Sequence, residues 1–316
     1  MSKEIFILLL VLCSILLMVS TAAAEKQNKL HGWIGLGGIA VYDRSESYLK
    51  NLDSAPGKKL TTLPMILSEI KYDIGSPGGL KWHLDTKPLI DEAGDFSIIS
   101  GLSYRFEKIL HLQTGIFFSP FENAWKNPYE TGIERDSTHT SIMGVKVELK
   151  RILESGLKAD FVYLNEDVDE DLIGQMTPDL RRDGNVYALS LNYRFYAARF
   201  WEFYSHLSIR HGDYAGPSYS FDKYKLAFSA GHAFGALMLL PEMFFSYKGY
   251  DRRHPIFDRT RIDHSYGFNL KINYLKPFGL DDWSVKAKLG YGRTDSNIIF
   301  FDDECLEFTV FLSYQF

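Results

Sequence analysis

The sequence predicts an all-β protein, a single up-and-down antiparallel transmembrane β-barrel of about 14 strands. Three observations support this prediction. Apolar and polar residues alternate along segments of about ten residues, short and long connections separate these segments in turn, and aromatic residues gather near both ends of the segments. The formal net charge of the 316 residues is -5, which excludes a strongly basic protein, so no nucleic-acid partner is expected.

A cleavable signal peptide is predicted over residues 1–24. A lysine near the start precedes an apolar run over residues 5–19, and Ala22-Ala23-Ala24 offers an A-x-A cleavage site before Glu25. An uncleaved membrane anchor is the alternative, but the apolar run is short and small residues stand where a signal peptidase requires them. Residues 25–316 are then expected to form one outer-membrane β-barrel.

Period-two alternation marks the expected strands. It is clearest over residues 187–195, 265–274, 283–292 and 306–316. A periplasmic β-sandwich would share this period, but its strands average about five or six residues, too short for these segments. Alternation is weaker near residues 30–42 and 60–72, so a barrel of about 12 strands is the alternative.

Connections of two lengths alternate along the chain, as expected for short periplasmic turns and longer extracellular loops. An even number of strands joined in this way returns both ends of the chain to the periplasm. The short connections are predicted at residues 73–78, 107–108, 151–155, 196–199, 234–237 and 276–282. The longer ones are predicted at residues 43–59, 86–95, 119–136, 166–181, 212–221, 250–262 and 296–303.

Aromatic side chains form two predicted belts, because rings with a polar edge favour the lipid headgroup layer. Tyr193 and Tyr274 exemplify the periplasmic belt, and Tyr163 and Tyr187 the outer one. The chain ends in Tyr314-Gln315-Phe316, which resembles the terminal signal that the barrel-assembly machinery reads on its clients. The resemblance implies that this machinery, outer-membrane lipid and lipopolysaccharide are partners, with Tyr314 and Phe316 as the signal residues.

The interior of the predicted barrel is rich in basic residues, and inward acids such as Glu148 and Glu307 are fewer. An interior of one dominant sign attracts counter-ions. This favours a passive, porin-like channel that prefers anions and passes small acidic solutes. A non-conducting surface barrel with recognition loops is the alternative. The basic residues expected to line the lumen are Lys146, Lys158, Arg194, Arg210, Lys223, Lys225, Lys271, Lys286 and Lys288.

Residues 166–171 concentrate five carboxylates. The run lacks the glycine and the regular ligand spacing of an EF-hand loop, so a solvated acidic loop is expected. We find no spacing typical of a metal site, phosphate loop or nucleophile elbow elsewhere in the sequence, and no cofactor is expected.

His139 and Ser141 are a weak alternative site. Residues at i and i+2 share one face of a strand, and these two are predicted to face outward near the extracellular rim. Outer-membrane phospholipases and lipid A deacylases use a similar His-x-Ser pair to activate a hydroxyl beside the lipid. Ile142 replaces the asparagine of the phospholipase pattern, and no third residue is evident to orient His139. A rim-sited lipid hydrolase is therefore kept only as a further alternative.

The C-terminal third carries His254-Pro255-Ile256-Phe257, Arg261-Ile262-Asp263 and Thr294-Asp295-Ser296-Asn297-Ile298. With these motifs the sequence resembles an uncharacterised family of proteobacterial outer-membrane barrels, which implies a barrel fold and offers no active residues to transfer. The last motif also resembles the closing hairpin in the barrel of surface-lipoprotein assembly modifiers. Those modifiers carry a helical repeat domain before the barrel that is not seen here, so their activity is not expected.

Overall fold

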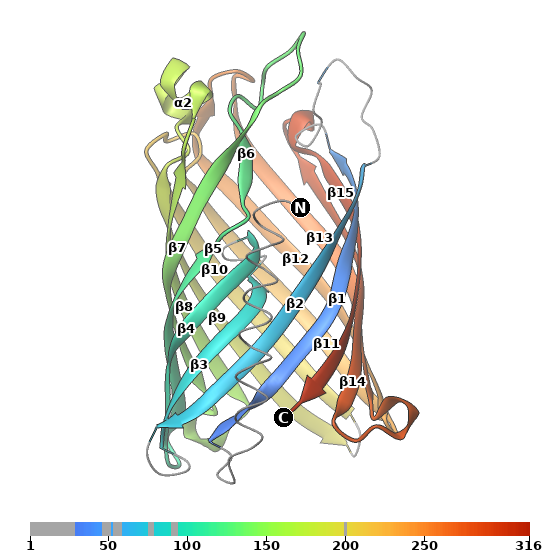
Figure 1. Ribbon diagram of the computed structural model, residues 1–316. Coiled ribbons are helices and arrows are strands. Elements are labelled where there is room, and N and C mark those ends of the chain that lie inside the picture. Colours follow the sequence, from blue (N-terminus) through green and yellow to red (C-terminus); the bar gives the residue numbers. More distant parts are fainter. Residues whose placement is uncertain (1–28, 46–51, 53–58, 75–78, 90–93, 199–200) are drawn as a thin grey trace, which may run out of the picture.

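The computed structural model describes residues 29–45, 52, 59–74, 79–89, 94–198 and 201–316, where the chain forms a closed antiparallel barrel (Figure 1). The predicted signal peptide lies outside the described residues. Within the described part of the chain, no helix is long and apolar enough to cross a membrane.

Fourteen strands of at least ten residues make up the barrel wall, which confirms the predicted count. A fifteenth, β6, has three residues and pairs beside the wall with β7. The strands are β1 (Leu30–Ser45), β2 (Lys59–Ile74), β3 (Leu80–Leu89), β4 (Gly94–Phe106), β5 (Leu110–Ser119), β6 (Asn123–Trp125), β7 (Ser137–Lys150), β8 (Leu157–Val168), β9 (Gly184–Ala198), β10 (Trp201–Tyr214), β11 (Phe221–Phe234), β12 (Leu237–His254), β13 (Arg259–Leu275), β14 (Trp283–Ser296) and β15 (Asp303–Gln315). Short helical turns lie between some of them: α2 (Leu172–Met176), η2 (Ile152–Glu154), η3 (Pro178–Leu180), η4 (Pro277–Gly279) and η5 (Ile299–Phe301).

Each strand pairs with its neighbour in sequence, except that β5 pairs with β7 and β1 pairs with β15. The second exception closes the barrel. At this seam the backbone N–H of Phe316 donates to the carbonyl of Gly32, and the N–H of Gly32 donates to the carbonyl of Phe316, both at 3.0 Å. Each strand of the wall therefore pairs with a neighbour on both sides, although β2 pairs with β3 only over residues 68–74.

The predicted alternation of short and long connections holds only in part. The connection over residues 276–282, expected to be short, has seven residues. The connections expected to be long over residues 86–95 and 250–262 have only four residues each, because β3 extends to Leu89 and β4 begins at Gly94, and because β12 extends to His254 and β13 begins at Arg259. The register of this pair shifts between Gly249 and Arg253, which breaks the alternation that marks a strand in the sequence.

Large apolar side chains cover the outside of the barrel. Leu36, Ile116 and Met243 are each more than 60% exposed, and many further leucine, phenylalanine and tyrosine side chains share this surface. A continuous apolar surface around a closed barrel matches the hydrocarbon core of a bilayer, where every backbone hydrogen bond must be made between strands. The protein is an outer-membrane β-barrel, and the side chains between the lipid-facing positions point into the lumen.

A small apolar core occupies part of the interior. It is formed by inward residues of β4, β5, β7, β8 and β9, including Ile99, Phe117, Val162 and Leu164, and Tyr214 of β10 packs against it. Packed side chains thus fill one side of the lumen near its outer half.

Candidate functional site

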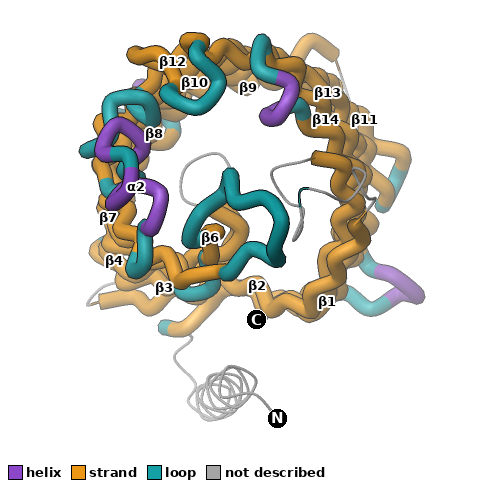
Figure 2. The backbone as a smooth tube through the Cα atoms, turned by 90° about the horizontal axis from the view of Figure 1, so that it is seen from above, coloured by secondary structure: helices purple, strands orange, loops and turns teal. Residues whose placement is uncertain are grey.

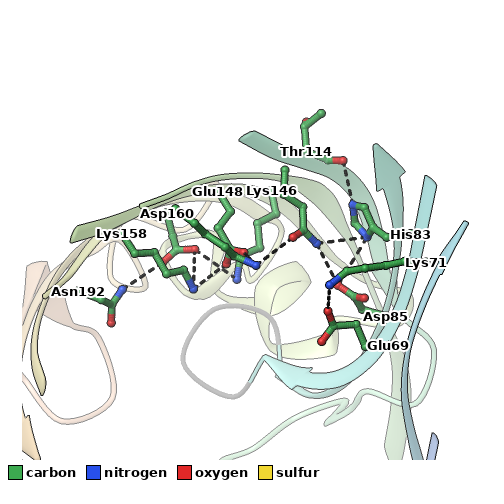
Figure 3. A network of polar contacts seen from close by, with 12 residues as sticks. Glu69, Lys71, His83, Asp85, Thr114, Lys146, Glu148, Lys158, Asp160 and Asn192 are labelled. Carbon is green, nitrogen blue, oxygen red and sulfur yellow. Dashed lines mark hydrogen bonds and ion pairs between the residues drawn. The ribbon is translucent and has the colours of Figure 1, made fainter. Parts of the chain in front are cut away.

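A charged network lines the lumen on β7, β8 and β9 (Figure 3). The Glu148 carboxylate, only 4% exposed, accepts from Lys150 and lies 2.6 Å from the Nζ of Lys158. Asp160 lies 3.2 Å from Lys158 and 3.9 Å from Lys146. The predicted lumen residues Lys146 and Lys158 are therefore largely balanced by carboxylates that lie beside them.

The network continues on to β2, β3 and β5. Lys150 donates to Gln113 at 3.0 Å, and Gln113 donates to Asp85 at 3.3 Å. His83, which is 1% exposed, lies beside Asp85 (Figure 3). Its Nδ1 also lies 3.3 Å from the side-chain nitrogen of Gln113. Because the lysines of this network lie beside carboxylates, it stiffens the wall and adds little net charge.

Two more predicted lysines have carboxylate partners on the neighbouring strand. Lys271 of β13 donates to Glu242 of β12 at 2.8 Å, and Lys288 of β14 donates to Glu307 of β15 at 2.6 Å. The expectation that inward acids would be few overlooked Glu242. Ion pairs of this kind reduce the positive potential that these lysines were expected to supply.

Lys286 and Arg194 have aromatic neighbours instead. The Nζ of Lys286 lies 3.8 Å from the ring centroid of Trp33, which is itself within hydrogen-bond distance of Glu69. The guanidinium of Arg194 lies 5.4 Å from the ring of Tyr196. Cation–π contacts hold a positive charge in place without neutralising it.

A further group of basic side chains lies on β10 to β13. Here the ammonium of Lys248 lies 3.8 Å from the ring centroid of Phe221 and 4.7 Å from that of Tyr250. The guanidinium of Arg261 also lies 4.7 Å from Tyr250, and it pairs with Asp263 at 2.7 Å. The expected lumen residues Arg210, Lys223 and Lys225 belong to the same wall, on β10 and β11.

A loop over residues 120–136, which carries β6, lies over the lumen when the barrel is viewed from above (Figure 2). Tyr129 of this loop reaches an aromatic cluster on the far side of the mouth, where its hydroxyl lies 3.0 Å from that of Tyr219 and 2.9 Å from Nε2 of His254. Burial raises the pKa of the Tyr129 hydroxyl well above its usual range, so the group stays uncharged at neutral pH. The rings that surround Tyr129 belong to His254, Phe257, Phe300 and Phe301.

This loop, which we call the roof loop, is tied to the next extracellular loop. Arg182 forms a buried ion pair with Asp171 at 2.6 Å and donates from the same nitrogen to the Lys126 carbonyl at 3.2 Å. Lys126 in turn donates to Glu170 at 2.6 Å. The expectation of a solvated acidic loop over residues 166–171 holds for Asp167, Asp169 and Glu170, which are exposed, but is wrong for Asp171, which is buried. Its partner Arg182 lies 11 residues further along the chain, and the local sequence does not show this pair.

The periplasmic mouth contains two cavities, of about 490 and 310 Å³. Arg105, His111 and Arg151 line both of them. Basic residues thus also surround the inner opening of the barrel, although their exposure to water weakens the field that they produce.

The weak alternative site does not assemble in the described part of the chain. His139 is exposed on β7 near the extracellular rim, as predicted, but no hydrogen bond joins its ring to Ser141. A nucleophile has to lie within hydrogen-bond reach of its base. The geometry gives no support to a hydrolase at this position.

The two predicted signal residues lie at the closing seam. The ring of Tyr314 packs against that of Trp283 on β14, with centroids 5.2 Å apart. Phe316 forms the backbone hydrogen bonds to Gly32 described above. Both residues thus lie where β15 meets β1 and closes the barrel.

Sequence reasoning missed Lys248, Arg261 and Tyr129. Lys248 continues an alternation on β12 in which Glu242, Phe244 and Ser246 point inward, a pattern present in the sequence. Nothing local marks Tyr129, because its partners are about 90 to 170 residues further along the chain.

Residues 36–315 match the model of a family described as "Protein of unknown function (DUF2860)". No curated protein shows significant sequence similarity to the chain. Among solved structures, OmpT of Vibrio cholerae, an outer membrane protein, is 8% identical, with 92% of this chain and 99% of that chain covered and a TM-score of 0.47. The outer membrane channel DcaP of Acinetobacter baumannii is 10% identical, with 91% and 96% covered and a TM-score of 0.45. OccK7 of Pseudomonas aeruginosa is also 10% identical, with 92% and 99% covered and a TM-score of 0.40. Similarities at this level do not indicate a solute.

Proposed function

As a member of the DUF2860 family, whose function is unknown, the chain has to be understood from its own interior, and we propose that it is a passive outer-membrane channel that prefers anionic solutes. The proposal assigns no catalytic step and no cofactor. Small acidic solutes would be its cargo, while lipopolysaccharide and the barrel-assembly machinery would be its partners in the membrane.

One observation carries the proposal, namely the uneven distribution of charge around the lumen. On β7 and β8 the lysines lie beside Glu148 and Asp160, so that wall is nearly neutral. On β12 the ammonium of Lys248 lies between the rings of Phe221 and Tyr250. A positive wall surrounded by low-dielectric material enriches anions in the water beside it.

Charge reversal tests this preference. Replacing Lys223, Lys225, Lys286 and Lys288 together by glutamate should move the zero-current potential in a salt gradient toward cations, while assembly is retained because the lipid face is unchanged. The shift should shrink as salt rises, since the screening length falls from about 10 Å at 0.1 M to about 3 Å at 1 M. Lys276→Glu, in an exposed periplasmic turn, is the matched control and should leave the potential unchanged. A selectivity that ignores all four reversals would contradict the proposed lining.

The roof loop favours a second candidate, a surface barrel that does not conduct. Tyr129 of this loop reaches the far side of the mouth, where its hydroxyl contacts the Tyr219 hydroxyl and the His254 imidazole. If the roof closes the lumen completely, the refolded protein will insert into a bilayer and pass no current. Conductance of the inserted protein therefore separates the two candidates.

A further inference from the structure

We propose that the wall around Lys248 is a binding site for an oxyanion, the carboxylate or phosphate group of a passing solute. The inference rests on the proposed channel function and deepens it, because it names the group that the lumen recognises.

The site is built from one row of the barrel wall. Arg210 of β10 lies directly opposite Lys223 of β11, which lies directly opposite Lys248 of β12. Asp263 of β13 is the next residue in the row, opposite Lys248. Three cations therefore occupy neighbouring positions at one level of the lumen, on three adjacent strands.

Asp263 and Glu166, two carboxylates near Lys248, each have another partner. Asp263 forms a two-point ion pair with Arg261, at 2.9 and 2.7 Å. Glu166 of β8, which lies within electrostatic reach of Lys248 and Arg210, accepts a hydrogen bond from the Tyr214 hydroxyl at 2.8 Å. Within the described part of the chain, no carboxylate oxygen lies within 4.0 Å of the Lys248 ammonium.

Aromatic rings hold that ammonium in position. The Phe221 and Tyr250 rings are both buried, while the side chain of Lys248 remains partly exposed. An ammonium has three N–H donors, and ring faces satisfy them less well than the oxygens of a carboxylate or phosphate would. The rings thus fix the position of the charge and leave its donors available to an oxyanion.

The row is unfavourable for folding alone. Like charges directly opposite each other on adjacent strands destabilise a sheet. Lys248 faces Lys223 on one side and Asp263 on the other, and Asp263 is already paired with Arg261, so the repulsion from Lys223 is only partly offset. An oxyanion bound at Lys248 would offset the rest.

The site lies next to the roof. The guanidinium of Arg261 lies 3.5 Å from the ring centroid of Phe301, and Phe301 belongs to the cluster that surrounds Tyr129. A solute that enters past the roof loop would meet this row at the start of its path. A site there would concentrate anions at the entrance of the lumen.

Direct binding tests the inference without any need for conduction. The full-length mature protein, folded in detergent, would be titrated calorimetrically with sodium phosphate and, separately, with sodium acetate, at constant ionic strength set with sodium chloride. We expect saturable binding of at least one probe, and the stronger probe identifies the group that is recognised. Lys248→Met should weaken that binding by about tenfold or more, as expected for loss of a hydrogen bond to a charged group. Lys271→Met removes a lumen lysine that already has a partner, Glu242, and should leave the affinity unchanged.

Thermal unfolding supplies a second measurement. Lys248→Met should unfold at a higher temperature than the wild type, because the substitution removes like-charge repulsion. If Lys248 had a purely structural role, the same substitution would lower the unfolding temperature. Lys248→Arg should fold and retain binding. Equal affinities of wild type and Lys248→Met, or no saturable binding of either probe, would overturn the inference. Saturable binding by a protein that passes no current would contradict the channel function and support the oxyanion site. Current without saturable binding would support the channel and contradict the oxyanion site.

Discussion

The hydroxyl of Tyr129 lies 2.9 Å from Nε2 of His254, although the two residues come from nearly opposite sides of the barrel. Tyr129 lies between β5 and β7, and His254 ends β12, with β8 to β11 between them in the wall. The contact therefore spans the outer mouth. His254 is only 3% exposed and lies among phenylalanine rings. The roof loop is therefore attached to the far side both by the hydroxyl–imidazole contact and by ring packing.

Removing this attachment should open the mouth. Tyr129→Ala takes away the ring contacts and both hydroxyl contacts, at a local cost of about 2 kcal/mol or more, so the roof loop should detach. We expect a larger single-channel conductance than that of the wild type in planar bilayers. Ile133→Ala, at an exposed position of the same loop, is the control and should conduct as the wild type does. Equal conductance of the wild type and Tyr129→Ala would show that the loop does not limit the current.

The second anchor of the roof is the ion pair between Asp171 and Arg182. Asp171→Ala leaves a buried guanidinium without its carboxylate, which typically costs about 3–5 kcal/mol. The local structure of residues 169–183 should loosen, and limited proteolysis of the folded protein should cleave there faster than in the wild type. The exposed Asp179→Ala, in the same loop, should be cleaved at the wild-type rate. Unchanged protection in Asp171→Ala would contradict the proposed anchoring.

The strands were predictable because a membrane barrel requires lipid-facing and lumen-facing residues to alternate along each strand. Where lipid and water face opposite sides, as along β14 and β15, alternation in the sequence locates the strand closely. It is weaker in β1, where glycines stand at residues 32, 35, 37 and 38 and provide no side chain for either face. There the connections on either side, and not the pattern itself, indicated a strand.

The site was only partly predictable. The inward lysines follow from strand phase, but their partners depend on the register between strands, which a single sequence does not show. The sequence predicts that Glu307 faces the lumen, and in the barrel it does. Its ion pair with Lys288, however, is seen only in the folded barrel. The roof depends on contacts between loops far apart in the chain, and no local pattern encodes such contacts.

Glu148 balances two lysines of the charged network. Glu148→Gln should leave Lys150 and Lys158 without this partner, lower the stability by about 3 kcal/mol and move the zero-current potential toward anions. Thermal unfolding and bilayer recordings measure the two effects. The exposed Asp251→Asn removes one carboxylate from the outer end of β12 and should change neither quantity. A stable Glu148→Gln protein with wild-type selectivity would show that this network does not face the conducting path.

Assembly should depend on the last side chain of the chain. Phe316→Asp keeps the backbone hydrogen bonds to Gly32 possible but replaces the aromatic ring with a charge, so recognition by the assembly machinery should be impaired. Less protein should reach the outer membrane in a heat-modifiable form, whereas Gln315→Ala should assemble normally. The assembled wild-type chain is expected to begin at Glu25. Normal assembly of Phe316→Asp would show that the ring is not part of the signal.

The central claim, a passive channel that prefers anions, is tested most directly by the zero-current potential of the wild-type protein. The refolded chain would be inserted into a planar bilayer that separates two concentrations of potassium chloride, whose ions have nearly equal mobility. The unequal charge of the lumen predicts a measurable conductance and a zero-current potential with the sign of chloride selectivity, which declines toward zero as the salt concentration rises. An inserted protein that passes no current, or a potential with the sign of potassium selectivity, would contradict the account.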